Sequence, residues 1–464
     1  LNSRSLGLFR STAMTSVDLS PAQPHVAFVA FPFGTHAAPL FALARAIAAA
    51  APGAALSFLS TARSLASLPQ AQGHGNIRLV PIADGTPESS AEPPPASEQA
   101  KIGMFLAAMP GSLRAGMDDA VAGAGGAAVS CVVSDAFLWM AGEVAETAGA
   151  PWVPLYTGGP ASLSAHFHTD LLRDTIGVGE RGKEQLHFIP GLSVHRVCDL
   201  PEGIVFGPLD SPFSCLLHRM GQSVAKAAAV LVNTFEGLDR TIDAEFSASF
   251  SKYLHIGPLH LLVPPAGPTP DTHYCLPWLD RHSPATVAYV SFGSVMTPQP
   301  AELAALAEGL EASGAAFLWS LKDHARELLP PGFLDRTKER GLVVSWAPQL
   351  DVLRHAAVGA FVTHCGWNSV LEAMTAGVPM VCHPFFGDQR MNARSVSLVW
   401  KIGVEFEGGA ITKEGVTRAL DTVLKGEEGK RMKAMACELK AMTTRAVQPQ
   451  GSSSVDLKRL MQFV

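Results

Sequence analysis

Short runs of apolar residues recur along the chain, and most are separated by segments long enough to form a helix. Continuous apolar runs without polar alternation are typical of strands buried on both faces of a parallel sheet. A helical pattern covers Ala37–Ala50, and another helix is expected after Glu236. This alternation predicts a doubly wound α/β domain. Its predicted strands lie at 25–31, 56–59, 77–82, 129–133, 152–156 and 230–232.

A second alternation follows a proline-rich stretch at 258–270 and contains a predicted helix, Ala301–Ser313. Its predicted strands lie at 287–292, 317–321, 342–345, 358–362 and 378–382. Proline-rich segments are stiff linkers, so the sequence predicts two domains. The expected boundaries are a mobile extension over 1–23, with Met14 as the natural start, a first domain over 24–257, a linker over 258–274, a second domain over 275–445, and a C-terminal helix over 446–464 that packs on the first domain.

Composition narrows the class of protein. Of the 464 residues, 47% are hydrophobic and 16% are charged, which fits a folded protein with large cores and excludes a disordered one. The net charge of −6 gives no basic surface for nucleic acid. The seven cysteines contain no CxxC pair, which predicts reduced thiols in the cytoplasm and no zinc site. No apolar run reaches the 18 residues that a membrane span needs, and the first 13 residues lack a secretory core.

Local chemistry points to a phosphate site after the strand that ends near Val362. A strand, a tight polar turn and a helix start leave backbone N–H groups free at a positive helix end, where they can hold phosphate. Ser369 and Glu372 are three residues apart and share one helix face, where the carboxylate could accept from the two hydroxyls of a ribose. Trp346 offers an aromatic face and Gln349 an amide edge for a base.

His36 and Asp135 follow two strands of the first predicted sheet. Because the carboxyl ends of parallel strands meet at one edge of a sheet, both residues are expected at the same edge. An Asp that accepts from one imidazole nitrogen fixes the tautomer, so the other nitrogen can take a proton from a hydroxyl. A surface or helix-capping role for His36, and a helix N-cap role for Asp135, are the structural alternatives.

The 44 residues from Trp346 to Gln389, WAPQLDVLRHAAVGAFVTHCGWNSVLEAMTAGVPMVCHPFFGDQ, resemble the nucleotide-sugar signature box of plant family 1 glycosyltransferases. The resemblance implies the GT-B fold, in which two Rossmann-like domains face each other across a cleft, and a UDP-sugar donor. An ordinary strand-turn-helix unit is the alternative. The implied donor-binding residues are Thr157, Ser294, Trp346, Ala347, Gln349, His364, Trp367, Asn368, Ser369, Glu372, Asp388 and Gln389, with Gln389 favouring glucose over galactose.

Three further segments, FPFGTHAAPL, SDAFLWM and YTGGPASLSAH, resemble the flavonoid and anthocyanidin 3-O-glucosyltransferase branch of that family. The resemblance implies an inverting transfer of glucose from UDP-glucose to the 3-hydroxyl of a flavonol or anthocyanidin, with His36 as the base and Asp135 as its partner. It implies no metal and no cofactor, and a monomer is expected. The acceptor would contact His36, Gln99, Phe137, His166 and Phe386. A proline-rich segment between Asp84 and Glu98 departs from this branch.

Other functions remain open at this point. The acceptor could be another phenolic or a terpenoid, or the chain could bind nucleotide sugars without catalysis. Gly177, Gly179 and Gly182 match the GxGxxG of NAD-dependent oxidoreductases, but the preceding segment is helix-like rather than a strand. Glu184 stands where a P-loop needs Ser or Thr, so we interpret this stretch as a loop.

Overall fold

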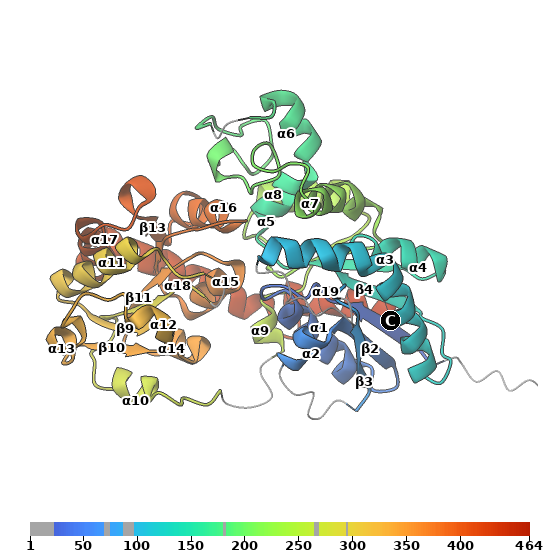
Figure 1. Ribbon diagram of the computed structural model, residues 1–464, viewed down its shortest axis with the longest axis horizontal. Coiled ribbons are helices and arrows are strands. Elements are labelled where there is room, and N and C mark those ends of the chain that lie inside the picture. The colour runs from blue at the N-terminus through green and yellow to red at the C-terminus, as the bar shows by residue number, and fades with distance from the viewer. Residues whose placement is uncertain (1–22, 69–74, 87–96, 180–181, 264–268, 294–295) are drawn as a thin grey trace, which may run out of the picture.

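The structure is a computed structural model that describes residues 23–68, 75–86, 97–179, 182–263, 269–293 and 296–464. Two fully parallel sheets form the centres of two α/β lobes, which Figure 1 shows side by side. This confirms the predicted fold class, two doubly wound Rossmann-like domains. The predicted extension over 1–23 lies outside the described residues except for residue 23, and most of the proline-rich segment before Glu98 lies outside them as well.

The first domain has a seven-stranded sheet in the order β3-β2-β1-β4-β5-β6-β7. Strands β1 and β4 are the neighbours at which the chain reverses its direction of winding, and Val26 of β1 pairs with Cys131 of β4. The strands are β1 (His25–Val29), β2 (Ala55–Thr61), β3 (Ile77–Ile82), β4 (Cys131–Asp135), β5 (Trp152–Tyr156), β6 (Val230–Val232) and β7 (Tyr253–His255). Its helices are α1 (Ala37–Ala50), α2 (Ala62–Ala66), α3 (Glu98–Gly123), α4 (Ala141–Thr147), α5 (Pro160–Phe167), α6 (Thr169–Ile176), α7 (Pro212–Ser223), α8 (Arg240–Ser249) and α9 (Leu259–Leu262).

The second domain repeats this winding with six strands in the order β10-β9-β8-β11-β12-β13. Its winding reverses between β8 and β11. The strands are β8 (Val287–Ser291), β9 (Ala316–Ser320), β10 (Gly341–Val344), β11 (Val358–Thr363), β12 (Met380–Cys382) and β13 (Gly403–Glu405). Its helices are α10 (Cys275–Leu279), α11 (Pro300–Ser313), α12 (Asp323–Arg326), α13 (Phe333–Thr337), α14 (Gln349–Arg354), α15 (Trp367–Ala376), α16 (Gln389–Arg394), α17 (Lys413–Lys425) and α18 (Glu427–Ala446). A last helix, α19 (Ser452–Leu460), follows them in sequence.

Each sheet is covered on both faces, which explains its continuous apolar strands. Phe28 of β1 packs with α1, whereas its neighbour Val29 packs on the other face with α3. Successive residues of a strand point to opposite faces, so a strand buried on both faces needs apolar residues without alternation. The first domain therefore has two cores, one on each side of its sheet.

The chain end returns to the first domain, and Figure 1 marks it within that domain. Leu460 of α19 is fully buried against the core that contains Val26 and Phe28. The Asp456 carboxylate accepts a hydrogen bond of 2.9 Å from the backbone N–H of His255 in β7. Helix α19 thus completes the first domain although it follows the second in sequence.

The predicted linker over 258–274 begins too early. Residues Leu259–Leu262 form α9, and Leu259 is buried against the same core as α1. Its Leu-rich sequence explains the difference, because apolar side chains next to a core gain free energy by burial. The segment around Gly177 follows α6 rather than a strand, as predicted for a loop, although residues 180–181 lie outside the described part.

Two broader expectations also concern the fold. All seven cysteines are free, as predicted from their number and spacing. Among the described residues, no helix combines the length and the low polarity that crossing a membrane requires.

Candidate active site between the two sheets

His36 and Asp135 meet at the reversal point of the first sheet, as predicted. His36 forms the N-cap of α1 just beyond β1, and Asp135 ends the neighbouring strand β4. The Nδ1 atom of His36 lies 2.8 Å from Oδ2 of Asp135. The other carboxylate oxygen accepts a 2.9 Å hydrogen bond from the backbone N–H of Phe137. Asp135 is 1% exposed and held from two sides, so it can fix the orientation of the imidazole.

The surroundings of His36 leave its second nitrogen available for chemistry. Burial lowers the pKa of His36, but the charge and hydrogen bond of Asp135, with a weaker contribution from Asp388, raise it above the ordinary value overall. A proton on Nδ1 is donated to Asp135, and the Thr157 hydroxyl lies 2.9 Å from the same nitrogen. None of the residues that the structure describes hydrogen-bonds Nε2. The neutral imidazole can therefore accept a proton at Nε2.

Thr157 was predicted as a sugar contact, and its position adds a second role. It follows β5, the strand next to β4, and its side chain is buried. The hydroxyl oxygen shares the Nδ1 proton with Asp135, which leaves the hydroxyl proton free to be donated elsewhere. Three adjacent strands of one sheet thus contribute to the same imidazole.

Aromatic side chains surround His36 on the side of the first domain. The ring of Phe137 lies 4.6 Å from the imidazole and that of Phe31 lies 5.2 Å from it. Phe33, Phe105 and Phe213 complete this aromatic cluster by ring contacts with Phe31. Only Phe137 was predicted. The sequence FPF before His36 offered a signal for two of the others, whereas α3 and α7 bring Phe105 and Phe213 from distant segments.

The other predicted acceptor residues lie on three separate segments. His166 on α5 is 4% exposed, and burial lowers its pKa to about 4. Its Nδ1 has no hydrogen-bond partner among the described residues, so it is a buried polar atom that a ligand could satisfy. Gln99 is exposed in the first turn of α3, and Phe386 is 42% exposed just before α16. No described hydrogen bond or ring contact joins these three residues to His36.

The start of α15 is open toward the other domain. Its N-cap is Gly366, no side chain caps its first N–H groups, and its first turn has no acidic residue. Free N–H groups at a positive helix end attract anions. A side chain at Gly366 would lie 2.5 Å from the His364 ring, so glycine is needed for the close approach of this turn. The predicted phosphate site therefore has the backbone geometry that it requires.

His364 lies beside this helix start at the reversal point of the second sheet. Burial lowers its pKa to about 4, so the imidazole is neutral. Its Nδ1 is buried without a hydrogen-bond partner among the described residues. An unsatisfied buried nitrogen costs free energy unless a ligand pairs with it. Ser294, predicted as a further phosphate contact after β8, lies outside the described residues.

Ser369 and Glu372 share one face of α15, as predicted from their spacing. Gln349, the first residue of α14, donates through Nε2 to Ser369 Oγ at 3.0 Å and to Glu372 Oε2 at 2.6 Å. Burial raises the pKa of Glu372 to about 7, although the Gln349 hydrogen bond opposes this. A buried carboxylate with one donor can accept further hydroxyl donors. Trp346 is 45% exposed and can stack on the base of a nucleotide, whereas the side chain of Ala347 is buried.

Asp388 and Gln389 begin α16, as the sequence indicated. The Asp388 Oδ2 atom accepts from Asn392 Nδ2 at 2.9 Å and from the Gly159 backbone N–H, in the first domain, at 3.3 Å. Gln389 Oε1 accepts from the backbone N–H groups of Phe385 and Phe386, so its amide N–H groups are the polar atoms left to bind a ligand. Asp388 thus contacts the first domain directly, and Gln389 is the next residue of the same helix.

The helix start and the His36 loop touch directly. Asn368 donates to the hydroxyl of Thr35, the residue before His36, at 3.4 Å. Trp367 is 3% exposed, and its indole N–H donates to the Asn233 carbonyl of the first domain at 2.8 Å. Its side chain therefore joins the two domains. Its backbone N–H remains as the group that could bind a sugar-nucleotide ligand. His36 and the start of α15 are therefore neighbours in space.

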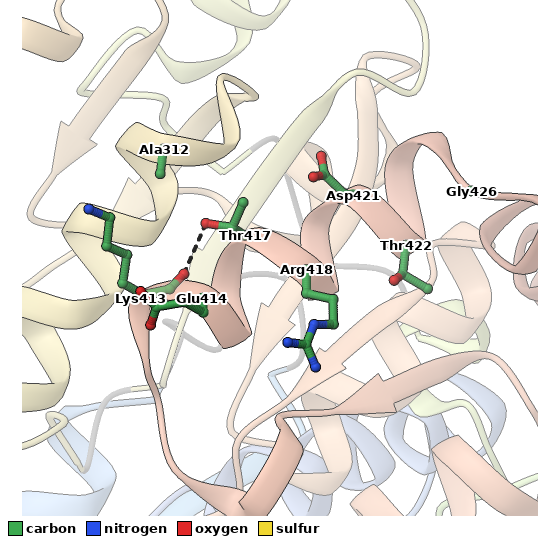
Figure 2. A pocket seen from close by; sticks show the side chains of 8 residues that line it. All are labelled: Ala312, Lys413, Glu414, Thr417, Arg418, Asp421, Thr422 and Gly426. Atoms are coloured by element: carbon green, nitrogen blue, oxygen red, sulfur yellow. Dashed lines mark hydrogen bonds between the residues drawn. The ribbon is translucent and has the colours of Figure 1, made fainter.

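A hollow of about 670 Å³ lies elsewhere, between α11 and α17 on the second domain. Figure 2 shows that Lys413, Arg418, Glu414 and Asp421 line it, so charges of both signs are present. None of the predicted site residues contributes to it. Among the described residues, no group of three or more His, Cys, Asp or Glu side chains is arranged to hold a metal ion.

Comparisons with known proteins point to one family. A sequence model of the family "UDP-glucoronosyl and UDP-glucosyl transferase" matches residues 70–442. A myricetin 3-O-rhamnosyltransferase of Crocosmia x crocosmiiflora is 51% identical over 96% of this chain and 98% of its own length. A flavonol 3-O-glucosyltransferase of Arabidopsis thaliana is 48% identical over 95% and 97%.

Solved structures show the same similarity. The crystal structure of a UDP-glucose:anthocyanidin 3-O-glucosyltransferase in complex with UDP has a TM-score of 0.90 and 39% identity, and the match covers 95% of this chain and 98% of that one. UGT2 of Phytolacca americana, complexed with UDP-2-fluoro-glucose and pterostilbene, has a TM-score of 0.81 and 27% identity over 95% and 99%. The architecture is shared over nearly the whole length of both.

Proposed function

Because the chain belongs to the UDP-glucoronosyl and UDP-glucosyl transferase family and is a UDP-dependent glycosyltransferase, we propose that it transfers glucose from UDP-glucose to the 3-hydroxyl of a flavonol or anthocyanidin. The names of its relatives support the acceptor class, since they include flavonol and anthocyanidin 3-O-glycosyltransferases. The observation that carries the proposal is the pairing of His36 with Asp135 next to the open start of α15.

In the proposed mechanism, the acceptor binds against the aromatic cluster with its hydroxyl near Nε2 of His36. The imidazole takes the hydroxyl proton while the oxygen attacks the anomeric carbon of glucose. The bond from that carbon to the UDP oxygen breaks, and the configuration inverts because only one displacement occurs. Asp135 stabilises the imidazolium that forms, by charge and by its hydrogen bond to Nδ1. General-base catalysis of this kind contributes roughly 10²–10⁴-fold.

The departing UDP gains negative charge on its diphosphate, and the second domain supplies the groups that stabilise it. The N–H groups at the start of α15, the Ser369 hydroxyl and His364 would contact the diphosphate. Preorganised donors of this type act where charge develops and need no reorganisation during the reaction. We propose that these groups replace a metal ion and that the enzyme works without metal or cofactor.

The remaining donor contacts follow from the same arrangement. Glu372 would accept from the ribose hydroxyls, Trp346 would stack on the uracil, and Asp388 with Gln389 would bind the sugar hydroxyls. His166, Gln99, Phe137 and Phe386 would line the acceptor. We expect the enzyme to be cytoplasmic and monomeric.

Incubating the purified protein with UDP-glucose and a flavonol tests the proposal. Mass and NMR spectra should show a 3-O-monoglucoside with inverted anomeric configuration, and UDP should form in equal amount. If no phenolic acceptor caused release of UDP, the proposal would be wrong. UDP-rhamnose is the second donor to test, because the relative at 51% identity is a rhamnosyltransferase.

A further inference from the structure

Helix α16 carries the predicted sugar contacts at its first turn and is built into both domains. Met391 is fully buried in the core of the first domain, with Val197 and Leu192. Two and five residues later, Ala393 and Val396 are fully buried in the core of the second domain. A single turn of helix thus spans the domain boundary. The position of Asp388 and Gln389 therefore depends on the first domain as well as on the second.

Polar side chains join the C-terminal end of α16 to residues 194–199 of the first domain. His195 lies in that segment, is fully buried, and places Nε2 3.2 Å from the Met391 carbonyl and 3.1 Å from Ser395 Oγ. The carbonyl only accepts, so Nε2 carries the proton and donates. Arg394 donates through Nε to the Val194 carbonyl at 3.0 Å. We call these contacts of His195 and Arg394 the α16 anchor.

A carboxylate strengthens the α16 anchor. Asp199 is 4% exposed, and Arg196 holds it with hydrogen bonds of 2.7 and 3.0 Å. Its Oδ2 also lies 3.6 Å from Arg394 Nε, so two guanidinium groups from different domains share one buried carboxylate. Pairing of this kind is directional, because planar guanidinium groups match carboxylates in few orientations.

The chain leaves α16 through a π-helical turn over Ser395–Val399. Wider turns of this type are rare and occur frequently at functional sites. Ser395, the first residue of the turn, is the residue whose hydroxyl meets His195. The irregular turn and the cross-domain contact therefore coincide.

At its other end, α16 meets the loop after β5. The Gly159 backbone N–H donates to Asp388, and a side chain at Gly159 would lie 2.3 Å from Asn392 Oδ1. The helix is therefore clamped at both ends by the first domain, which also carries His36. Small displacements matter here, because a misplacement of 1 Å at a reacting group can cost about 10²-fold in rate.

We propose that His195 and Arg394 are positioning residues that fix α16, and with it Asp388 and Gln389, in register with His36. The inference rests on the proposed role of that pair in holding the sugar. The proposed UDP contacts lie elsewhere, at α14 and the start of α15. Loss of the anchor should thus slow transfer of the sugar while leaving the affinity for UDP unchanged.

His195→Leu keeps the size of the side chain and removes its donor, whereas His195→Gln keeps an N–H near the same place. With the best donor and acceptor pair of the wild type, His195→Leu should lower kcat roughly 10–100-fold. The Kd of UDP, measured by calorimetry, should stay within about twofold, as expected when only an interaction of the transition state is lost. His195→Gln should recover most of the rate, and the acid limb of the pH profile should not move, because His36 and Asp135 are untouched.

Ser397→Ala is the matched control. Its hydroxyl lies on the same π-helical turn but bonds within the second domain, to the carbonyls of Ala393 and Arg394 and to Glu405. Its loss should leave kcat near that of the wild type. If Ser397→Ala slowed transfer as much as His195→Leu, the segment would act only through its own folding and the proposal would be wrong.

Arg394→Ala provides an independent test, because this side chain is partly exposed and its removal is easier for the fold to tolerate. It should show the same fall in kcat with unchanged UDP affinity. An unchanged kcat, or a loss of UDP affinity in proportion to the loss of rate, would overturn the proposal. Failure of the proposed function has a different signature, since the wild type itself would then give no flavonoid glucoside.

Discussion

Replacing Asp135 by Asn changes the proposed base with little change of shape. The carboxylate is 1% exposed, 2.8 Å from Nδ1 of His36 and 2.9 Å from the Phe137 N–H. An amide in the same place can donate to Nδ1. The imidazole proton would then lie on Nε2, the nitrogen that has to take the proton from the hydroxyl of the flavonoid. The site would keep its geometry, but Nε2 would already carry a proton and could not act as the base.

The size of the loss has two contributions. A hydrogen bond to a charged group is worth about 1.5–3 kcal/mol, which corresponds to roughly 10–150-fold in rate. Loss of general-base catalysis altogether costs roughly 10²–10⁴-fold. We therefore expect kcat/KM to fall by about 10²–10⁴-fold in Asp135→Asn, with the Kd of UDP unchanged because the proposed UDP contacts lie in the other domain.

The pH profile gives a second signature of the same variant. His36 must be neutral to accept a proton, so kcat/KM of the wild type should fall as the pH drops through the raised pKa of His36. In Asp135→Asn, the charge and the hydrogen bond that raise the pKa of His36 most are lost. Burial then lowers this pKa. The acid limb of the residual activity should move to lower pH. Initial rates over a pH series measure both effects. A loss below about tenfold, with the acid limb of the profile unchanged, would show that Asp135 does not support His36 as the base.

Three further predictions concern the donor side. Burial raises the pKa of Glu372 to about 7, so KM for UDP-glucose should rise as the pH falls below that value, by up to about tenfold per unit, and this rise should vanish in Glu372→Gln. Trp346→Ala should weaken UDP binding, measured by calorimetry, by about 1–3 kcal/mol if the exposed indole stacks on the base. An excess of chelator should leave the initial rate unchanged, and a loss restored by added Mg²⁺ would contradict the proposed metal-free mechanism.

Much of the fold follows from patterns within single segments. The apolar strands Trp152–Tyr156 and Val230–Val232 have the predicted bounds, because strands buried on both faces need continuous apolar runs. The strands Tyr253–His255 and Gly403–Glu405 were not predicted. With three residues each, they carry too little pattern, and their pairing with a neighbouring strand decides their conformation.

The candidate site was predictable where it depends on the ends of strands. His36 follows β1 and Asp135 ends β4, and these strands pair, so their meeting follows from the rule that carboxyl ends share one edge. The contacts of His195 with α16 were not predictable, because they join residues about 200 positions apart and no local pattern specifies which surfaces of two domains meet. The spacing of Ser369 and Glu372 indicated their common face but not that Gln349 would bridge them.

Removing the imidazole in the variant His36→Ala is the sharpest test of the proposed role of His36 as the base. The measurement is the rate of flavonol glucoside formation at saturating UDP-glucose, in a preparation whose affinity for UDP-glucose has been shown to match the wild type. If His36 is the base, this rate should fall by about 10²-fold or more. An unchanged turnover would contradict it.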